Sequence, residues 1–206
     1  GAVDMVLTGY NSNGAAISIS AIKGGSSTEI VAGFSMALDS SDTLYISGIF
    51  TGTANGPGFS MTSLGGQDIF VAKVSTSGSY VWAKSAGTAD DDSVEDIAAF
   101  ANGDVFISGS FATRMDIGDD SVISSGYNDA YAAHITSDGD WEWVESMGGS
   151  NYEYSFGIAA SDQDKIAITG GFADTINKGS STISSTSSLD LFVWELDPIL
   201  NKDSDG

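Results

Sequence analysis

Two sequence blocks return at one fixed interval in this chain of 206 residues, and this repeat limits the possible folds more than any other feature. The first block ends in Ser-Gly-x-Phe or Thr-Gly-x-Phe and occupies 43–50, 104–111 and 165–172. The second block begins with Asp and occupies 68–74, 129–135 and 190–196. Successive copies of both blocks are 61 residues apart, so the sequence predicts a repeated structural unit of that length.

Each unit contains four segments with the composition of β-strands, rich in Val, Ile, Thr and aromatic residues and separated by Gly, Asn and Asp. The segments 101–104 and 137–140 have the composition of hairpin turns. Four short antiparallel strands repeated at a fixed period are typical of a β-propeller blade. A β-sandwich does not require a strict repeat and a β-solenoid usually has a shorter one. We therefore predict an all-β fold of propeller blades, with the sandwich and the solenoid as alternatives.

The order of the expected strands divides the chain into about three blades. Segment 1–27 supplies the third and fourth strands of an incomplete blade, 28–87 and 88–148 are complete blades, 149–197 lacks its fourth strand, and 198–206 is an acidic tail or the start of a calcium-loop linker.

A closed propeller has at least four blades, so a chain with about three leaves two hypotheses about its partners. In one, the remaining blades belong to a longer precursor. In the other, segment 15–21 of one copy supplies the missing fourth strand to the last blade of a second copy. The exchanged dimer would be a six-bladed ring with two-fold symmetry.

The charge of the chain argues against two classes of partner. It has 28 Asp and Glu against 7 Lys and Arg, a formal net charge of −21. Nucleic acid and anionic membrane surfaces both bind basic proteins, so neither is expected. No stretch is long and apolar enough for a membrane-spanning helix, and membrane insertion is not expected either. The absence of cysteine excludes a thiolate nucleophile, a zinc–thiolate site and disulfides.

The repeated blocks resemble the bacterial seven-bladed β-propeller repeat family. In that family Asp-x-Phe-Val-x-Lys precedes a Ser-Gly turn, a strand with Trp, and Val-Tyr-Val-x-Gly-Ser-Phe. Here these motifs read 68–73, 77–78, Trp82 and 105–111. The third repeat departs from the pattern at Ala167, where the family has an aromatic residue. The resemblance implies a propeller fold and an extracellular or cell-surface location, and it brings no catalytic residues.

Calcium is the one cofactor that the sequence suggests, because carboxylate and amide oxygens are its preferred ligands. The C-terminal segment carries oxygen donors at alternate positions, as at the start of a calcium loop: Asn201, Asp203 and Asp205. A loop before an expected strand carries three consecutive carboxylates: Asp90, Asp91 and Asp92. The alternatives are a disordered acidic tail and a solvated turn.

An Asp recurs at the start of each third strand, at Asp4, Asp68, Asp129 and Asp190. A side chain repeated in every unit is expected to bond the backbone of the adjacent turn rather than a ligand.

Three aromatic residues have no equivalents in the other repeats: Trp141, Tyr152 and Tyr154. Aromatic rings beside carboxylates can stack on sugar rings, so these residues are candidates for contact with a glycan or a partner. Trp82 and Trp143 are equivalent and are expected to pack between blades. The only histidine, His134, aligns with Lys73 and Glu195, and we expect it to face solvent or a blade edge.

These observations favour a non-enzymatic structural or interaction module of a secreted or cell-surface protein, in which rigid blades present a platform for protein or surface contacts. No nucleophile elbow, phosphate loop or His-based metal motif is present. The second hypothesis is a calcium-assisted, lectin-like module that binds carbohydrate. The third is a hydrolase or lyase on the rim of a propeller, for which paired acids would be needed.

Overall fold

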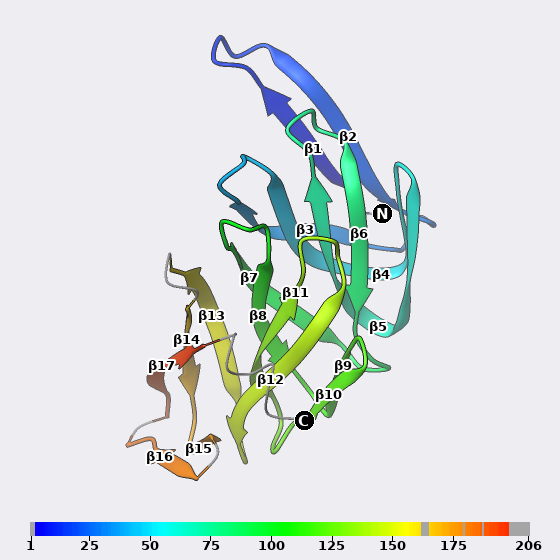
Figure 1. Cartoon of the computed structure of the whole chain (residues 1–206). Helices are drawn as coiled ribbons and strands as arrows, with labels where there is room; N and C mark the ends of the chain where they lie inside the picture. The colour runs from blue at the N-terminus through cyan, green and yellow to red at the C-terminus, as the bar shows by residue number, and fades with distance from the viewer. Residues whose placement is uncertain (1–2, 162–164, 179, 187, 198–206) are drawn as a thin grey trace.

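The computed structural model describes residues 3–161, 165–178, 180–186 and 188–197 (Figure 1). All the regular secondary structure in these residues is β-strand, and the named strands pair antiparallel. The predicted all-β class is confirmed. Among the described residues there is no helix with the length and apolar composition needed to cross a bilayer.

The described strands form two six-stranded sheets, one three-stranded sheet and one two-stranded sheet. Within them the chain runs through an N-terminal hairpin and three successive meanders, each of which we call a sheet. The N-terminal hairpin consists of β1 (Met5–Tyr10) and β2 (Ala16–Gly24). The first sheet contains β3 (Val31–Leu38), β4 (Leu44–Gly56), β5 (Phe59–Val74) and β6 (Tyr80–Ala86). The central sheet contains β7 (Asp92–Ala99), β8 (Val105–Phe111), β11 (Asp129–Ile135) and β12 (Trp141–Gly149). The last sheet contains β13 (Glu153–Ala160), β14 (Ile166–Phe172) and β17 (Asp190–Leu196).

A small hairpin projects between the second and third strands of each sheet, where the sequence suggested only a loop. It is formed by β9 (Arg114–Ile117) with β10 (Asp120–Ile123), and by β15 (Thr175–Lys178) with β16 (Ser181–Ser184). In the first sheet the outer ends of β4 and β5 form it. These hairpins connect neighbouring sheets, because β15 pairs with β12 and the outer end of β4 pairs with β2.

The pairing register follows the same interval as the sequence blocks. The first two strands of each sheet begin their pairing at Val31 with Phe50, Asp92 with Phe111, and Glu153 with Phe172. A bulge follows at the equivalent place in all three sheets. In the N-terminal hairpin Met5 pairs with Ile22, as Ile69 pairs with Ala86, at an interval of 64 residues. By this register β1 and β2 correspond to a third and a fourth strand.

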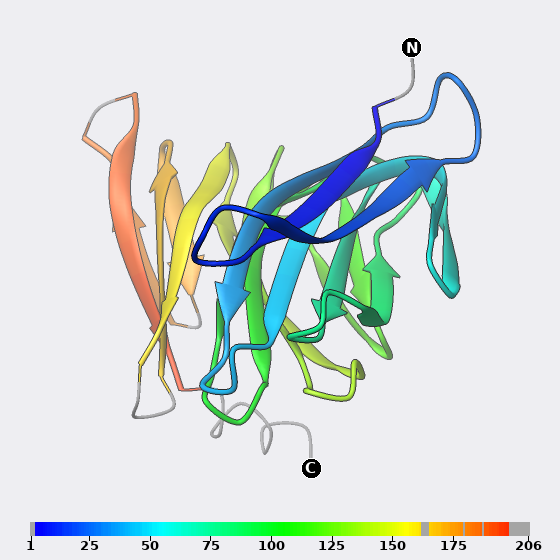
Figure 2. The same cartoon turned by 90° about the horizontal axis from the view of Figure 1, so that it is seen from above.

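The sheets stack face to face along the chain, from the blue hairpin to the red β17 in Figure 1, and Figure 2 shows the stack from above. Three apolar clusters lie between successive layers. All residues of β8 and β11 are buried because the central sheet is covered on both faces. Such a strand contributes apolar side chains to two cores, each stabilised by roughly 25 cal/mol per Å² of buried apolar surface.

A polar contact also joins the first strands of the three sheets. The Asp96 carboxylate of β7 accepts a hydrogen bond from Ser35 Oγ of β3 at 2.6 Å and from the Ile158 amide of β13 at 2.9 Å. Ser35 and Asp96 occupy equivalent bulge positions. This carboxylate therefore fixes the spacing between β3, β7 and β13.

Candidate functional site

Three tyrosines form an exposed stack at the beginning of the last sheet. The ring centroids of Tyr127 and Tyr152 lie 4.9 Å apart at an interplanar angle of 11°. Those of Tyr152 and Tyr154 lie 6.1 Å apart at 7°. All three side chains are exposed. The stack therefore presents a continuous aromatic surface to solvent.

Backbone pairing between the central and last sheets holds this stack together. Asn128 and Tyr152 form an isolated parallel bridge. The Tyr127 amide donates to the Asn151 carbonyl at 3.0 Å, and the Glu153 amide donates to the Asn128 carbonyl at 2.8 Å. The sequence does not indicate that Tyr127 belongs to this stack, because the bridge connects segments of two different repeats and leaves no periodic pattern.

Trp141 does not join the tyrosines. It begins β12, whereas Tyr152 follows the other end of that strand, a separation of roughly 25 Å at 3.3 Å per residue. Its side chain is partly buried and packs against the apolar cluster between the first and central sheets. Trp143, in contrast, is buried in the cluster between the central and last sheets, and Trp82 packs against the preceding cluster, as expected from their equivalence.

The outer face of the last sheet, on the side away from the central sheet, is apolar and open to solvent. In β17 buried and exposed side chains alternate, so that Leu191 and Val193 point outward. Phe156 and Leu189 are also exposed and lie close to Gly171 on this face. Tyr154 pairs with Gly171, which pairs in turn with Leu191, and so extends the face toward the tyrosine stack. We call Tyr154, Phe156, Leu189, Leu191 and Val193 the C-terminal open face.

The equivalent positions in the other sheets are buried. Leu191 is 77% exposed, whereas Ile69 and Ala130, which occupy the same position, are 0% exposed. Val193 is 74% exposed, whereas Val71 and Ala132 are 0% exposed. In those sheets the position faces the following sheet. The C-terminal open face is thus half of a contact whose other half is not supplied by the described residues.

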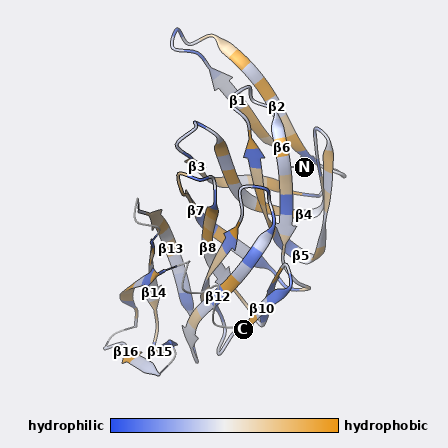
Figure 3. Cartoon of the chain, viewed as in Figure 1, coloured by the Kyte–Doolittle hydropathy of each residue, from blue (hydrophilic) through white to orange (hydrophobic). Residues whose placement is uncertain are grey.

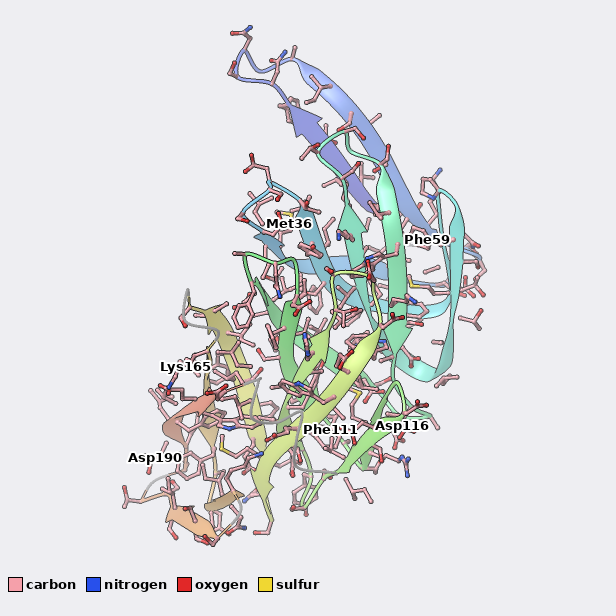
Figure 4. All side chains as sticks on the ribbon, viewed as in Figure 1. Met36, Phe59, Phe111, Asp116, Lys165 and Asp190 are labelled. Carbon is pink, nitrogen blue, oxygen red and sulfur yellow. The ribbon has the colours of Figure 1, made fainter. Side chains whose placement is uncertain are left out.

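A second open surface lies on β3, on the side of the first sheet that faces the N-terminal hairpin. Figure 4 labels Met36 on β3, below the N-terminal hairpin, and Asp190 at the start of β17, near the other end of the molecule. Met36 is 64% exposed, whereas its equivalents Ile97 and Ile158 are 4% and 8% exposed. A cavity of about 350 Å³ separates β1 from β3 here and is lined by Met5, Leu7, Phe34, Met36 and Ile46, among others. We call Phe34, Met36 and Leu38 the N-terminal open face.

The three acidic residues of the predicted calcium loop have separate hydrogen-bond partners. Asp90 accepts from Thr113 Oγ1 at 2.5 Å, and Asp91 accepts from the Gln67 amide at 2.8 Å. Asp92 is buried and accepts from the Thr88 amide at 2.7 Å. Asn201, Asp203 and Asp205 lie outside the described residues. Within the described ranges no group of three or more Asp, Glu or His side chains converges as in a metal site.

The recurrent Asp side chains bond the adjacent turn, as the sequence predicted. Asp68 accepts from the Leu64 amide, Asp129 from the Ser125 amide, and Asp190 from the Thr186 amide, each four residues earlier. Asp4 instead accepts from the Gly24 amide at 3.1 Å. These carboxylates are part of the strand architecture.

Two pairs of buried carboxylates lie where neighbouring sheets meet: Asp68 with Asp92, and Asp129 with Glu153. Each of these four carboxylates has one oxygen without a hydrogen-bond partner among the described residues. Burial, with smaller contributions from Asp68 and Asp90, raises the pKa of Asp92 to about 7. Burial, followed by Asp129 and Asp174, raises the pKa of Glu153 to about 7 against the opposing hydrogen bond from Gly149. One carboxyl of each pair, Asp92 or Glu153, therefore has a pKa close to neutral pH, and burial also raises the pKa of Asp68 and of Asp129.

His134 is buried on β11, which is paired on both sides, so the expectation that it faces solvent or a blade edge was wrong. Its ring stacks on Phe106 with centroids 4.6 Å apart, and Nε2 lies 3.6 Å from an Asp104 oxygen. The equivalent Lys73 reaches the Ser137 carbonyl instead. The aromatic rings of Phe106 and Trp143 accommodate the flat imidazole in the central sheet. The equivalent residues Lys73 and Glu195 are polar and therefore gave no indication that this position is buried.

No model of a known protein family matches the chain, and no curated protein matches it either. The distinctive elements of its surface are two open apolar faces and one aromatic stack, which are suited to binding by contact.

Proposed function

We propose that the chain is a non-enzymatic structural or interaction module of a secreted or cell-surface protein, built from propeller blades of the bacterial repeat type described above. It acts by presenting the C-terminal open face to another β-sheet. One observation carries this proposal: Leu191 and Val193 are exposed at positions that are completely buried in the two preceding sheets. A contiguous exposed apolar surface of this kind is typical of a site for protein contact.

The electrostatics of the molecule support recognition through apolar contact. The net charge of −21 keeps the chain soluble and repels unrelated acidic proteins. The backbone and side chains of the open face are held in place by the opposite side of the same sheet, where Phe192, Trp194 and Leu196 are buried against the central sheet. A face fixed in this way loses little conformational entropy on binding.

Binding of the neutral dye Nile red at nanomolar protein concentration tests this proposal. We expect saturable fluorescence that falls by more than half in the double variant Leu191→Thr/Val193→Thr, because Thr keeps the β-branched shape and removes apolar surface. The control is Ile123→Thr, which changes an equally exposed residue (70%) on β10, outside both open faces. Equal fluorescence from the wild type and the double variant would refute the open face as a binding surface.

A second candidate function is calcium-assisted carbohydrate binding, and the stack of Tyr127, Tyr152 and Tyr154 favours it. Parallel, exposed rings can pack against successive sugar rings. Binding to immobilised neutral polysaccharides should weaken about tenfold in Tyr152→Ala and remain unchanged in Tyr10→Ala, a lone exposed tyrosine on β1. Binding that survives a chelator would remove calcium from this function, and no difference between the two variants would reject the tyrosine site.

A further inference from the structure

The two open faces are opposite halves of one contact that the chain already makes twice. Inside the molecule β7 packs on the face formed by β3, β4 and β5, and β13 packs on the face formed by β7, β8 and β11. In both cases a first strand covers the outward face of the preceding sheet. The C-terminal open face has no such strand above it among the described residues, and β3 carries the N-terminal open face.

From this we infer that the occupant of the C-terminal open face is β3 of a second copy of the chain, with β17 pairing with β2 of that copy. This inference rests on the proposed function and names its partner. A second copy supplies both missing halves at once, because each molecule carries one of each. Each contact joins the C-terminal open face of one molecule to β3 of the other. When the same contact forms in both directions, the two molecules form a closed dimer.

The strand β1 occupies the place that β17 of the second copy would take. The register of the hairpin makes β1 a third strand, equivalent to β5, β11 and β17. No residue of β1 is buried, and only Ile22 of β2 is. In contrast, every second residue of β17 is buried against the central sheet. Exchange therefore replaces a weakly packed strand by a well-anchored one, while β2 remains paired.

The outward residues of the hairpin are consistent with such a replacement. Ile17 and Ile19 of β2 are exposed, and Figure 3 shows the corresponding hydrophobic colour along this strand. The cavity between β1 and β3 also shows that β1 does not fill the space over Phe34 and Met36. The three-stranded last sheet of a second copy covers this space in the way that the first sheet covers β7.

The internal register predicts which residues meet. Val71 of β5 lies opposite Lys84 of β6. The equivalent residues are Val193 of one copy and Ser20 of the other. In the isolated chain Ser20 lies opposite Leu7 instead. The partner of Ser20 therefore distinguishes the two states: it is Leu7 of the same chain in the monomer and Val193 of the other copy in the exchanged dimer.

Cysteine cross-linking of the full chain tests the inference against a background without native cysteine. The variant Ser20→Cys/Val193→Cys should give, on oxidation at micromolar concentration, a covalent dimer of twice 21.1 kDa as its main product. The single variants are the controls for random collision. The matched variant Leu7→Cys/Ser20→Cys, oxidised after equilibration, should form its bond within one chain at nanomolar concentration and give a lower yield of that bond at micromolar concentration, where exchange has already displaced β1.

A dimer yield no higher than that of the single variants would overturn the inference, and a ladder of larger species would overturn closure with two copies. Nile red binding separates this failure from failure of the proposed function. Dye that binds at Leu191 and Val193 in a chain that never cross-links leaves the open face intact as a site for another partner. If neither the cross-linked dimer nor dye binding at Leu191 and Val193 is observed, both proposals are refuted.

Discussion

The carboxylates of Asp92 and Glu153 make the sheet junctions sensitive to protons. Each pKa is raised to about 7, mainly by burial, while an unfolded chain has the ordinary value near 4. The folded state therefore binds more protons than the unfolded state between about pH 4 and pH 7. The contribution of these groups to the free energy of unfolding is fully present below the pKa of the unfolded chain. It is lost as the pH rises through the pKa of the folded chain.

The variant Asp92→Asn isolates this effect. Asn can still accept the hydrogen bond from the Thr88 amide, and it carries no charge to be buried beside Asp68 and Asp90. We expect urea unfolding at pH 8 to show a gain of at least about 1–2 kcal/mol in the free energy of unfolding, since one pKa unit is worth about 1.4 kcal/mol. The gain should vanish at pH 4.

The control is Asp119→Asn, which neutralises an exposed carboxylate in the turn between β9 and β10. Its effect on unfolding should be small and similar at both pH values. A pH-independent effect of Asp92→Asn would show that the carboxylate is not held near neutrality by the fold.

At the scale of elements, the strands with the strongest repeat were the most predictable from the sequence. The range 129–135 was expected as a strand and is observed as β11, because alternation, a leading Asp and a flanking turn all agree there. The small hairpin β9–β10 was missed. Its strands are four residues long, and its position is fixed by a tertiary hydrogen bond from the Val144 amide to Asp120.

The candidate sites were less predictable than the strands, for a similar reason. Tyr152 and Tyr154 stood out because they have no equivalents, but Tyr127 reaches them only through the bridge between Asn128 and Tyr152. The open faces could not be recognised in the sequence, because Leu191 and Val193 match the apolar residues that are buried in the other repeats. Whether such a residue is buried depends on the next layer and not on its own strand.

The whole molecule is a stack of sheets. Its two open faces correspond to the two sides of the contacts that neighbouring sheets make inside it. Its high negative charge opposes association of two copies at low ionic strength, and salt screens this repulsion over about 10 Å at 0.1 M. Apolar contact between the open faces is favourable and is not weakened by salt. Association of the chain should therefore strengthen as salt is added, which is the opposite of an assembly held by ion pairs.

The most direct test of this account is the solution mass of the wild type and of Leu191→Thr/Val193→Thr, measured by light scattering over a range of protein and salt concentrations. We predict that the wild type moves from 21.1 kDa toward twice that mass as protein and salt increase, while the double variant stays at 21.1 kDa and retains its β-sheet circular dichroism. A wild type that remains at 21.1 kDa throughout, or a double variant that associates equally well, would contradict the account.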